Sequence, residues 1–406
     1  MPPGSRGPSV AEPIRLGLFA AFDPSWGGGE SFLANLLTVI GRRPELEVVL
    51  FHPRDAGETR VARWRALGAV PRPLDQLTRH HPAWWMRKLG ERLDLPWLDG
   101  FDRVLAGRVD ATFLRPLPCR APVVPNLHWI PDFQERHLPE MFSAAERRSR
   151  AAEHERFLSR SALTLVQTDA AAEELVGWFP MHAERARVLP FAVTIPSRAL
   201  MADPVELLEP FGLPERFVYL PGQLWRHKNH GLVAEALARV PDLTVVSTGH
   251  LVDYRAPDHV VALRARLTEL GVERRFRLLG PVPLDIVFAL HRRAMALLNP
   301  SRFEGWSTTV EEAKALGRPL LLSDIRTHRA QATAPDRAGW FGVDDVDGLA
   351  RLLMAVRDEG VPGPDPMAEA QALDAYELAR ARFAYGFVRI VSEAVGRPLA
   401  TPPPSG

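Results

Sequence analysis

The chain has 406 residues, of which 46% are hydrophobic and 24% are charged, a composition typical of a soluble globular protein. This length exceeds what a single core ordinarily supports, so we expect two domains. A net charge of +1 gives the whole molecule no field that would attract nucleic acid or an anionic membrane. Cys119 is the only cysteine, which excludes an internal disulfide framework and a cysteine-based zinc cluster.

The basic residues are almost all arginine. Only three of the 50 lysine and arginine residues are lysine, which leaves 47 arginines; the three are Lys88, Lys228 and Lys314. This bias is typical of a GC-rich coding sequence. In such a chain a lysine indicates a position that requires a compact ammonium, because the planar guanidinium of arginine does not replace it at a phosphate.

Strands and helices alternate along the whole chain. In the first half, apolar runs predict strands at residues 14–21, 47–51, 111–114, 123–124 and 163–167, with a loop at 22–29 and a helix at 30–40. In the second half, they predict strands at residues 217–220, 243–247, 276–279, 294–298 and 320–322. This alternation predicts an α/β protein with doubly wound parallel sheets.

The proline-containing segment 190–196 is predicted to link the two halves. We therefore expect a first domain over residues 1–195 and a second over residues 196–375, followed by a helix at 376–397. The ends of the chain, residues 1–12 and 398–406, are rich in Pro, Gly and Ser and are predicted to be disordered tails.

Residues 301–312 form the most informative segment. They follow the predicted strand at 294–298 and lead into a short helix that ends near Gly317. A turn followed by a helix start exposes unpaired backbone N–H groups, which makes an anion site. The residues expected there are Glu304, Gly305, Trp306, Ser307, Thr308 and Glu312.

Two carboxylates flank this expected anion site, Glu304 on the turn and Glu312 on the helix. An anion site binds phosphates and carboxylates bind hydroxyls, so together they predict a nucleotide-sugar as the ligand. The alternative is a capping box, either Thr308 with Glu311 or Thr309 with Glu312. A capping box explains one glutamate, but it explains neither Glu304 nor the turn at Gly305.

A second predicted strand, at 217–220, also leads into a polar loop. Gln223, Arg226 and Lys228 follow it, and ligands of open α/β sheets bind at the carboxyl ends of strands. Lys228, with Gln223 and Arg226 nearby, is expected to neutralise a diphosphate. The alternative is an ordinary solvated loop. The scarcity of lysine in this chain argues against that alternative, because an arginine would serve equally well in a solvated loop.

A third loop carries three consecutive glycines, Gly27, Gly28 and Gly29. Glycines let the backbone approach a ligand closely and expose N–H groups to it. The segment is neither a Walker loop nor a dinucleotide fingerprint, and a simple turn remains the alternative.

His128, Asp132 and His137 lie together in the segment 126–139, which is predicted to be a loop after a strand. Their spacing matches no ordinary zinc pattern, so we favour contact with a sugar or an acceptor. A structural role for each histidine stays open.

Residues 79–92 mix cations with two tryptophans, as in segments that contact a membrane surface. A partly buried helix with a solvated face is the alternative. No apolar run approaches the ~20 residues that cross a bilayer, and the N-terminus lacks the apolar stretch of a secretory signal. We therefore expect a cytoplasmic protein, with weak peripheral contact at the inner membrane face as an open alternative.

Together and in this order, these segments resemble family 4 of the retaining glycosyltransferases (glycosyl transferases group 1), over most of the chain. The most specific part is 299–324, which is similar to the paired-glutamate motif of that family. The resemblance implies a GT-B fold, with two Rossmann-like domains that face a cleft. The first domain would bind the acceptor, the second would bind the nucleotide-sugar, and helix 376–397 would pack back on the first.

The resemblance also implies roles for single residues. Glu304 would lie beside the donor sugar and Glu312 would hold the ribose. Lys228 and the N–H groups of residues 305–308 would bind the diphosphate, and the loop at Val282 would contact the base. The family usually has arginine where this chain has Gln223, which puts the strength of diphosphate binding in doubt.

By this resemblance the chain would transfer a sugar from a nucleoside diphosphate to an acceptor hydroxyl, with retention of configuration. The acceptor would be a glycan, a lipid-linked molecule or a small molecule. No cofactor beyond the nucleotide-sugar and no metal is expected, and no Asp-x-Asp pair is expected after a predicted strand. The alternatives are a sugar-nucleotide epimerase of related fold and a binding protein without turnover.

Overall fold

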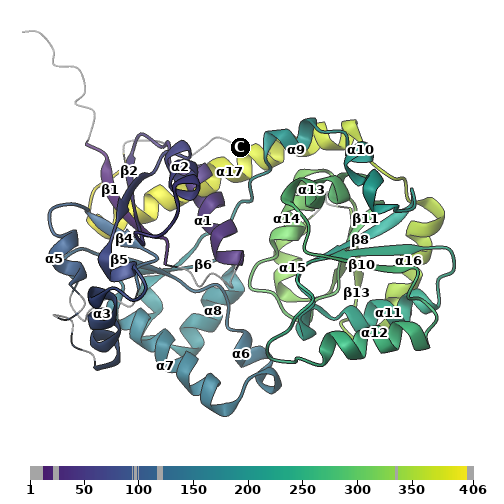
Figure 1. Ribbon diagram of the computed structural model, residues 1–406, viewed down its shortest axis with the longest axis horizontal. Coiled ribbons are helices and arrows are strands. Elements are labelled where there is room, and N and C mark those ends of the chain that lie inside the picture. Colours follow the sequence, from purple (N-terminus) through teal and green to yellow (C-terminus); the bar gives the residue numbers. More distant parts are fainter. Residues whose placement is uncertain are drawn as a thin grey trace, which may run out of the picture. The chain divides into compact units, whose positions relative to one another are not determined.

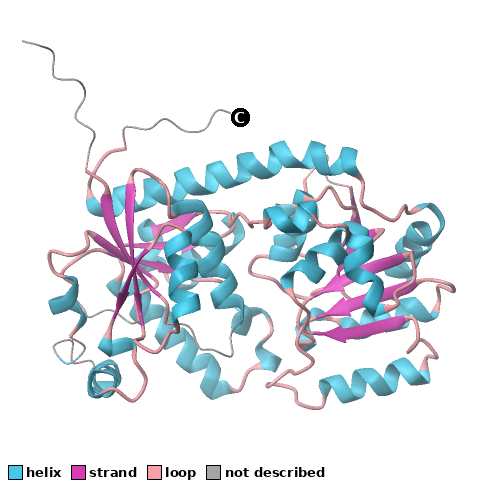
Figure 2. Ribbon diagram, turned by 45° about the horizontal axis from the view of Figure 1, so that its top comes forward, coloured by secondary structure: helices cyan, strands magenta, loops and turns pink. Residues whose placement is uncertain are grey.

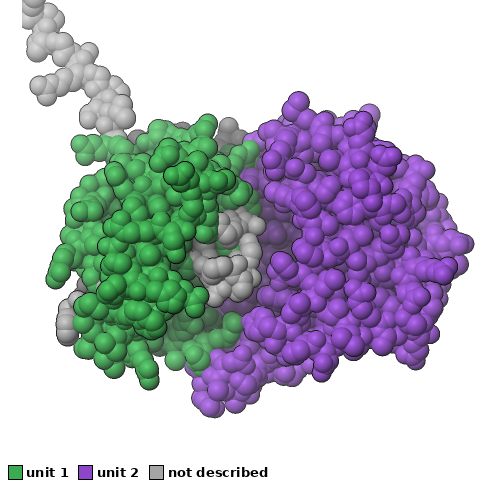
Figure 3. All heavy atoms as spheres, viewed as in Figure 1, with its two compact units in different colours: residues 1–130, 149–190, 380–406 green, residues 131–148, 191–379 purple. Residues whose placement is uncertain are grey.

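The computed structural model describes residues 12–21, 27–93, 95, 98, 100–116, 122–333 and 337–399. The chain forms two compact units (Figures 1, 2 and 3). Unit 1 comprises residues 1–130, 149–190 and 380–406, and unit 2 comprises residues 131–148 and 191–379. The tails predicted to be disordered lie almost wholly outside the described residues.

Unit 1 is built on a parallel sheet of seven strands in the order β3-β2-β1-β4-β5-β6-β7. Its strands are β1 (Ile14–Phe19), β2 (Leu46–His52), β3 (Val70–Pro73), β4 (Ala111–Phe113), β5 (Asn126–Trp129), β6 (Leu163–Val166) and β7 (Ala186–Val188). Its helices are α1 (Gly27–Ile40), α2 (Glu58–Ala66), η1 (Asp75–Leu77), α3 (Pro82–Leu93), α5 (Phe101–Leu105), α8 (Asp169–Trp178) and η3 (Pro180–Arg185), with most of α7 (Ala144–Arg160).

Unit 2 is built on a parallel sheet of six strands in the order β10-β9-β8-β11-β12-β13. Its strands are β8 (Phe217–Pro221), β9 (Thr244–Thr248), β10 (Phe276–Gly280), β11 (Ala296–Asn299), β12 (Leu320–Ser323) and β13 (Ala338–Phe341). Its helices are α6 (Gln134–His137), η2 (Pro139–Met141), α9 (Ser197–Met201), α10 (Pro204–Leu208), η4 (Glu209–Phe211), η5 (Arg226–Lys228), α11 (His230–Ala238), α12 (His259–Glu269), α13 (Leu284–Arg293), α14 (Thr308–Ala315), α15 (Arg326–Gln331) and α16 (Val346–Glu359).

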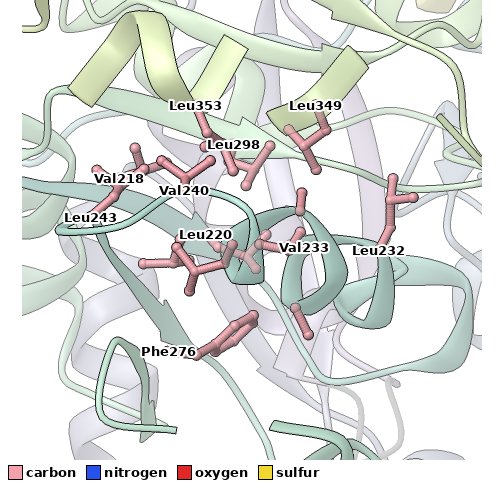
Figure 4. Close-up of a cluster of buried hydrophobic side chains, with 14 of the residues drawn as sticks. Val218, Leu220, Leu232, Val233, Val240, Leu243, Phe276, Leu298, Leu349 and Leu353 are labelled. Atoms are coloured by element: carbon pink, nitrogen blue, oxygen red, sulfur yellow. The ribbon is translucent and has the colours of Figure 1, made fainter. Parts of the chain in front are cut away.

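The core of unit 2 covers both faces of its sheet, because the strands are apolar on both sides. Alternate residues of β8 point to opposite faces: Val218 and Leu220 pack against α11, α12 and α16 (Figure 4), whereas Phe217 and Tyr219 pack against α10 and α13. The sheet is therefore doubly wound, as the sequence predicts. In such a sheet the strand order reverses between β8 and β11, and ligands bind beyond the carboxyl ends of the strands at this switch point.

One strand of unit 1 lies elsewhere than predicted. The sequence predicts a strand at residues 123–124 and a loop from 126, but β5 is Asn126–Trp129, and Asn126 pairs with Thr112 of β4. Pro122 and Pro125 flank the predicted strand, and proline has no N–H for a ladder. The first helix also begins earlier than predicted, at Gly27.

Residues 131–148 group with unit 2, although the sequence places them in the first domain. Arg255 explains this, because its guanidinium donates to Gln134 Oε1 over 2.9 Å and lies 4.5 Å from the ring centre of Phe142. The ring of His137 also stacks on Phe303, with 4.7 Å between the ring centres.

The last helix, α17 (Pro366–Val395), begins in unit 2 and ends in unit 1. In unit 2, its Glu369 carboxylate pairs with Arg292 over 2.8 Å, and its Tyr376 hydroxyl accepts a hydrogen bond from Ile195 N over 2.9 Å. In unit 1, the ring of Phe387 meets Phe113 edge-on at 5.2 Å. Each half of α17 therefore packs within its own unit. Among the described residues, no helix is both long enough and apolar enough to cross a membrane.

Candidate functional site

The loops after β8 and β11 join at the switch point of unit 2. Arg302 N donates to His227 O over 2.8 Å, and Asn229 Nδ2 donates to Pro300 O over 3.2 Å. Asn229 adopts a left-handed conformation, with φ of 59°, which ends the short turn η5 and starts α11. These bonds hold the predicted lysine loop against the predicted glutamate loop.

Lys228 and Glu304, one from each loop, form an ion pair. Lys228 Nζ lies 2.6 Å from Glu304 Oε1, and Ser301 Oγ donates to the same oxygen over 2.6 Å. Burial raises the pKa of the Glu304 carboxyl, but Lys228, together with His227 and His328, outweighs burial and lowers the pKa to about 2. Glu304 is therefore a fixed carboxylate at neutral pH, able to accept hydrogen bonds and unable to donate a proton.

The end of the neighbouring strand β12 and the helix α15 that follows it hold the Glu304 loop in place. Thr327 Oγ1 donates to the backbone oxygen of Glu304 over 2.6 Å, and Ser323 Oγ donates to Ser301 O over 2.6 Å. Buried His328 lies with its Nδ1 2.9 Å from Ser323 O. The sequence analysis missed these three residues. Their position, at the end of β12 or in the helix α15 that follows it, was the available signal.

Gln331 fixes the start of α14. Its Oε1 accepts from Ser307 N over 3.1 Å, and its Nε2 donates to Ser307 O over 2.9 Å and to Glu311 Oε1 over 2.9 Å. Thr308 and Thr309 lie within the first helical turn, so neither is the residue that caps the helix. Both capping boxes considered from the sequence are therefore wrong.

Glu312 lies on α14 with its side chain largely buried. Its Oε2 is 3.3 Å from Nε2 of the fully buried His291 on α13. His291 in turn meets the ring of Tyr219 edge-on at 4.9 Å. The Glu312 carboxylate thus lies against a buried histidine that the sequence analysis did not single out.

The remaining predicted residues of unit 2 surround the same strand ends. Gly222 and Gly249 adopt φ angles of 128° and 129°, and a Cβ on Gly249 would come within 2.3 Å of Gly222 O. This close approach requires glycine. Gln223 is half-buried beside them, and Arg226 is exposed, with its N bonded to Asp253 Oδ2 over 2.9 Å. Val282 is half-buried in the loop after β10.

Gly305 is packed tightly against the segment that carries Asp132. A Cβ at position 305 would come within 2.1 Å of Pro131 O and 2.6 Å of Asp132 Cβ. Asp132 Oδ1 accepts a hydrogen bond over 3.0 Å from the backbone N of Gln134, the first residue of α6. Trp306 follows; its indole Nε1 is buried and has no acceptor among the residues that the structure describes.

The other predicted residues belong to unit 1. His128 lies on β5, where its ring stacks on Phe157 with 4.2 Å between the centres. Burial, with a small contribution from His154, lowers the pKa of His128 to about 3, so the ring is neutral. Gly27, Gly28 and Gly29 form the first turn of α1 rather than a loop. The preceding part of that predicted glycine loop, residues 22–26, lies outside the described residues.

No cluster of His, Cys, Asp and Glu in the described part of the chain could hold a metal ion. One Asp-x-Asp spacing was overlooked, Asp345 and Asp347, because the sequence analysis did not predict β13. Asp345 Oδ1 accepts from Gly348 N over 2.7 Å and starts α16, and Asp347 pairs with Arg239. Both carboxylates therefore have structural partners.

The arrangement places one ionised carboxylate, one ammonium and a helix start at the carboxyl ends of adjacent strands. Such a site can accept bonds from hydroxyls and stabilise phosphate charge. Residues 209–369 match the family model for glycosyl transferases group 1. The matched segment contains the Lys228 loop, the Glu304 loop and α14. A comparison with curated protein sequences finds no match.

Solved structures share the fold over nearly the whole chain. The Anabaena protein HepE in complex with UDP and glucose has a TM-score of 0.64 at 17% identity, covering 94% of this chain and 99% of that one. Sucrose-phosphate synthase from Thermosynechococcus elongatus has a TM-score of 0.66 at 15% identity, covering 94% and 98%. WaaG, a glycosyltransferase involved in lipopolysaccharide biosynthesis, has a TM-score of 0.60 at 17% identity, covering 94% and 99%.

These likenesses confirm the predicted fold, two α/β domains with parallel sheets as in the GT-B glycosyltransferases. The match of residues 209–369 supports the resemblance to glycosyl transferases group 1 over this part of the chain. The narrower assignment to family 4 stays a prediction.

Proposed function

We propose that the chain is a retaining glycosyltransferase. It would bind a nucleoside-diphosphate sugar in unit 2, break the bond between the anomeric carbon and the diphosphate, and form a bond from the same carbon to the oxygen of an acceptor hydroxyl. The hydroxyl proton would pass to the departing diphosphate. The observation that carries this proposal is the Lys228–Glu304 pair, because it lies at the switch point of a domain that matches glycosyl transferases group 1.

Glu304 is proposed to hold the donor sugar. Lys228 and Ser301 both bind its Oε1, whereas no described residue donates to its Oε2. A carboxylate with a pKa of about 2 can accept hydrogen bonds from sugar hydroxyls with that second oxygen. It is also a fixed negative charge beside an anomeric carbon that becomes positive in the transition state.

Lys228 is proposed to stabilise the departing diphosphate. An ammonium has three donors, and Glu304 takes one of them. The first N–H groups of α14, which Gln331 holds in place, would share the phosphate charge. Glu312 would accept from the ribose, and the Val282 loop would contact the base. The donor needs no metal in this arrangement, since the cation and the helix start supply the positive charge.

The test combines donor binding with product analysis. Thermal unfolding in the presence of a panel of nucleotide-sugars, with UDP-sugars first because HepE binds UDP and glucose, identifies the donor as the one that raises Tm. Incubation with that donor and candidate acceptors should yield a glycosylated acceptor with the anomeric configuration of the donor. An isomerised nucleotide-sugar would instead show an epimerase, and binding without any product would show a protein that has lost turnover.

A further inference from the structure

Helix α3 (Pro82–Leu93) presents an apolar outer face in unit 1. Trp85, Leu89 and Leu93 follow one another at helical spacing, and Met86 lies beside them. Their exposed fractions are 58%, 48%, 54% and 50%, respectively. Single exposed apolar residues are common on protein surfaces, but a continuous stripe of four large ones indicates a contact surface.

The opposite face of α3 fixes this orientation. Buried Arg87 donates from Nε to Gln76 O over 2.9 Å and pairs with Glu91 on the next turn. Arg156 of α7 donates to Glu91 O over 2.7 Å. The helix is therefore attached to unit 1 through its polar inner side, which leaves the apolar stripe outward.

Cations border the apolar stripe. Arg79, Lys88 and Arg92 are exposed, and Glu91, the carboxylate of α3, is shared between Arg87 and Lys88. Residues 79–93 thus hold four cations (Arg79, Arg87, Lys88 and Arg92) and one carboxylate, a net charge of +3 with histidine neutral. The whole chain carries only +1, so this positive charge is local.

We propose that α3 docks unit 1 on an anionic lipid bilayer. An apolar stripe with cations at its edge is the pattern of helices that lie in the plane of a membrane surface, with large side chains among the acyl chains and cations at the headgroups. The charges disfavour a second copy as the occupant, since a symmetric dimer through this face would bring like charges together. The proposal does not depend on the proposed function.

Vesicle sedimentation with the full chain tests the proposal. The protein should bind vesicles with one-third phosphatidylglycerol in phosphatidylcholine and should bind pure phosphatidylcholine at least ~10-fold more weakly. Raising the salt from ~0.1 M to ~0.5 M should weaken the binding, because the electrostatic part is screened. Leu89→Glu with Leu93→Glu should lower the vesicle partition coefficient at least ~10-fold.

Matched controls separate the face from general surface effects. Met181 is 88% exposed in η3 of the same unit, so Met181→Glu adds a carboxylate elsewhere and should leave binding unchanged. Arg79→Gln with Arg92→Gln should weaken binding to anionic vesicles, whereas Arg63→Gln with Arg65→Gln on α2 should not. Unchanged thermal unfolding in each variant shows that the fold is intact.

Three outcomes overturn the proposal. Wild-type protein that stays in the supernatant with anionic vesicles has no membrane-docking face. A loss of vesicle binding in Met181→Glu equal to that in Leu89→Glu with Leu93→Glu shows that binding does not depend on α3. Self-association at rising protein concentration that disappears in Leu89→Glu with Leu93→Glu, without vesicle binding, assigns the face to a dimer.

Discussion

Lys228 serves two partners in the proposed reaction, and the structure shows only one of them. Its ammonium lies 2.6 Å from Glu304 Oε1, so it neutralises a buried carboxylate before any donor arrives. The diphosphate would be its second partner. A substitution at position 228 therefore changes both the stability of the loop pair and the charge at the leaving group, and the two effects have to be measured separately.

Lys228→Ala should lower kcat at least ~100-fold, the scale observed when one preorganised donor is removed from a transition state. Lys228→Arg should recover only part of this activity, because a planar fork cannot place its charge at the same point. Gln223→Arg in the Lys228→Ala background should recover some activity if both positions face one phosphate. Steady-state kinetics with the identified donor measure all three.

Adding Glu304→Gln to Lys228→Ala separates stability from turnover. Lys228→Ala alone leaves a buried carboxylate without its cation and should destabilise the fold by about 3–5 kcal/mol. The double variant should regain stability in urea unfolding but no turnover. Arg239→Ala, which removes an exposed ion pair with Asp347, is the control. Near-normal turnover in Lys228→Ala would assign the diphosphate to Arg226 or to the backbone.

Glu312 is the second residue whose role can be decided by substitution. Glu312→Ala should weaken nucleotide binding by about 1–3 kcal/mol, the loss of a charge-assisted hydrogen bond to the ribose. Isothermal titration with the nucleoside diphosphate measures this. Exposed Glu273→Ala in the same unit should bind normally. If Glu312→Ala binds the nucleotide as wild type does and is only less stable, the carboxylate serves His291 instead.

Among the elements, the turn at Gly305 depends on the segment before α6. A Cβ at position 305 would meet Pro131 O at 2.1 Å and Asp132 Cβ at 2.6 Å, and neither is the end of a flexible side chain. Gly305→Ala should therefore shift the Glu304 turn, lower stability by about 1–3 kcal/mol and reduce turnover. Urea unfolding and kinetics together measure it.

Gly231 provides the matched control for this prediction. It lies in α11, and a Cβ there would meet no atom within 4 Å. Gly231→Ala should leave turnover unchanged and leave stability equal or up to about 1 kcal/mol higher, since alanine restricts the unfolded chain. Equal stability loss in the two variants would show that the contact of Gly305 with residues 131–132 is not what matters.

Central strands could be predicted from the sequence, but short edge strands could not. β8 and β11 are buried on both faces and appear as nearly continuous apolar runs. β3 and β7 are only three or four residues long and partly exposed, and β3 contains two prolines. Such segments have no periodicity of their own, because pairing with a neighbouring strand is what makes them strands.

The same limit applies to the candidate site. Glu304 and Lys228 could be proposed because each lies in the loop directly after a buried strand, where a charged residue has few structural reasons to be. Glu312 could be proposed because it lies on the helix that follows the Glu304 loop. Gln331 and His291 could not be predicted, because each contacts a residue that is distant in the sequence. Gln331 binds Ser307, which lies 24 residues earlier in the chain, and His291 of α13 contacts Glu312 of α14. Long-range partners leave no local pattern.

For the whole molecule, the proposed reaction predicts independence from divalent metals. Lys228 and the start of α14 would carry the phosphate charge that a cation carries in other enzymes. Turnover with the identified donor should persist in excess EDTA and should not rise when magnesium or manganese is added. Complete loss in EDTA, restored by either ion, would contradict the proposed charge stabilisation.

Stability should fall steeply in mild acid, because unit 2 buries neutral histidines. Burial lowers the pKa of His227 and of His230 to about 3, from an ordinary value of 6.5. Between pH 6.5 and pH 3, these histidines are protonated in the unfolded chain and neutral in the folded chain. The stability contribution is therefore complete above pH 6.5 and is lost progressively as the pH falls toward 3, by about 1.4 kcal/mol per pH unit for each histidine.

His230→Leu tests this linkage at one position. His230 is buried and neither ring nitrogen has a partner among the described residues, so an apolar side chain removes the titration without leaving a bond unmade. The free energy of unfolding, measured in urea from pH 7 to pH 4, should fall with a slope about 1.4 kcal/mol per pH unit shallower than in wild type. The variant should gain stability relative to wild type as the pH falls. Parallel slopes would mean that His230 takes up its proton in the folded protein as readily as in the unfolded chain.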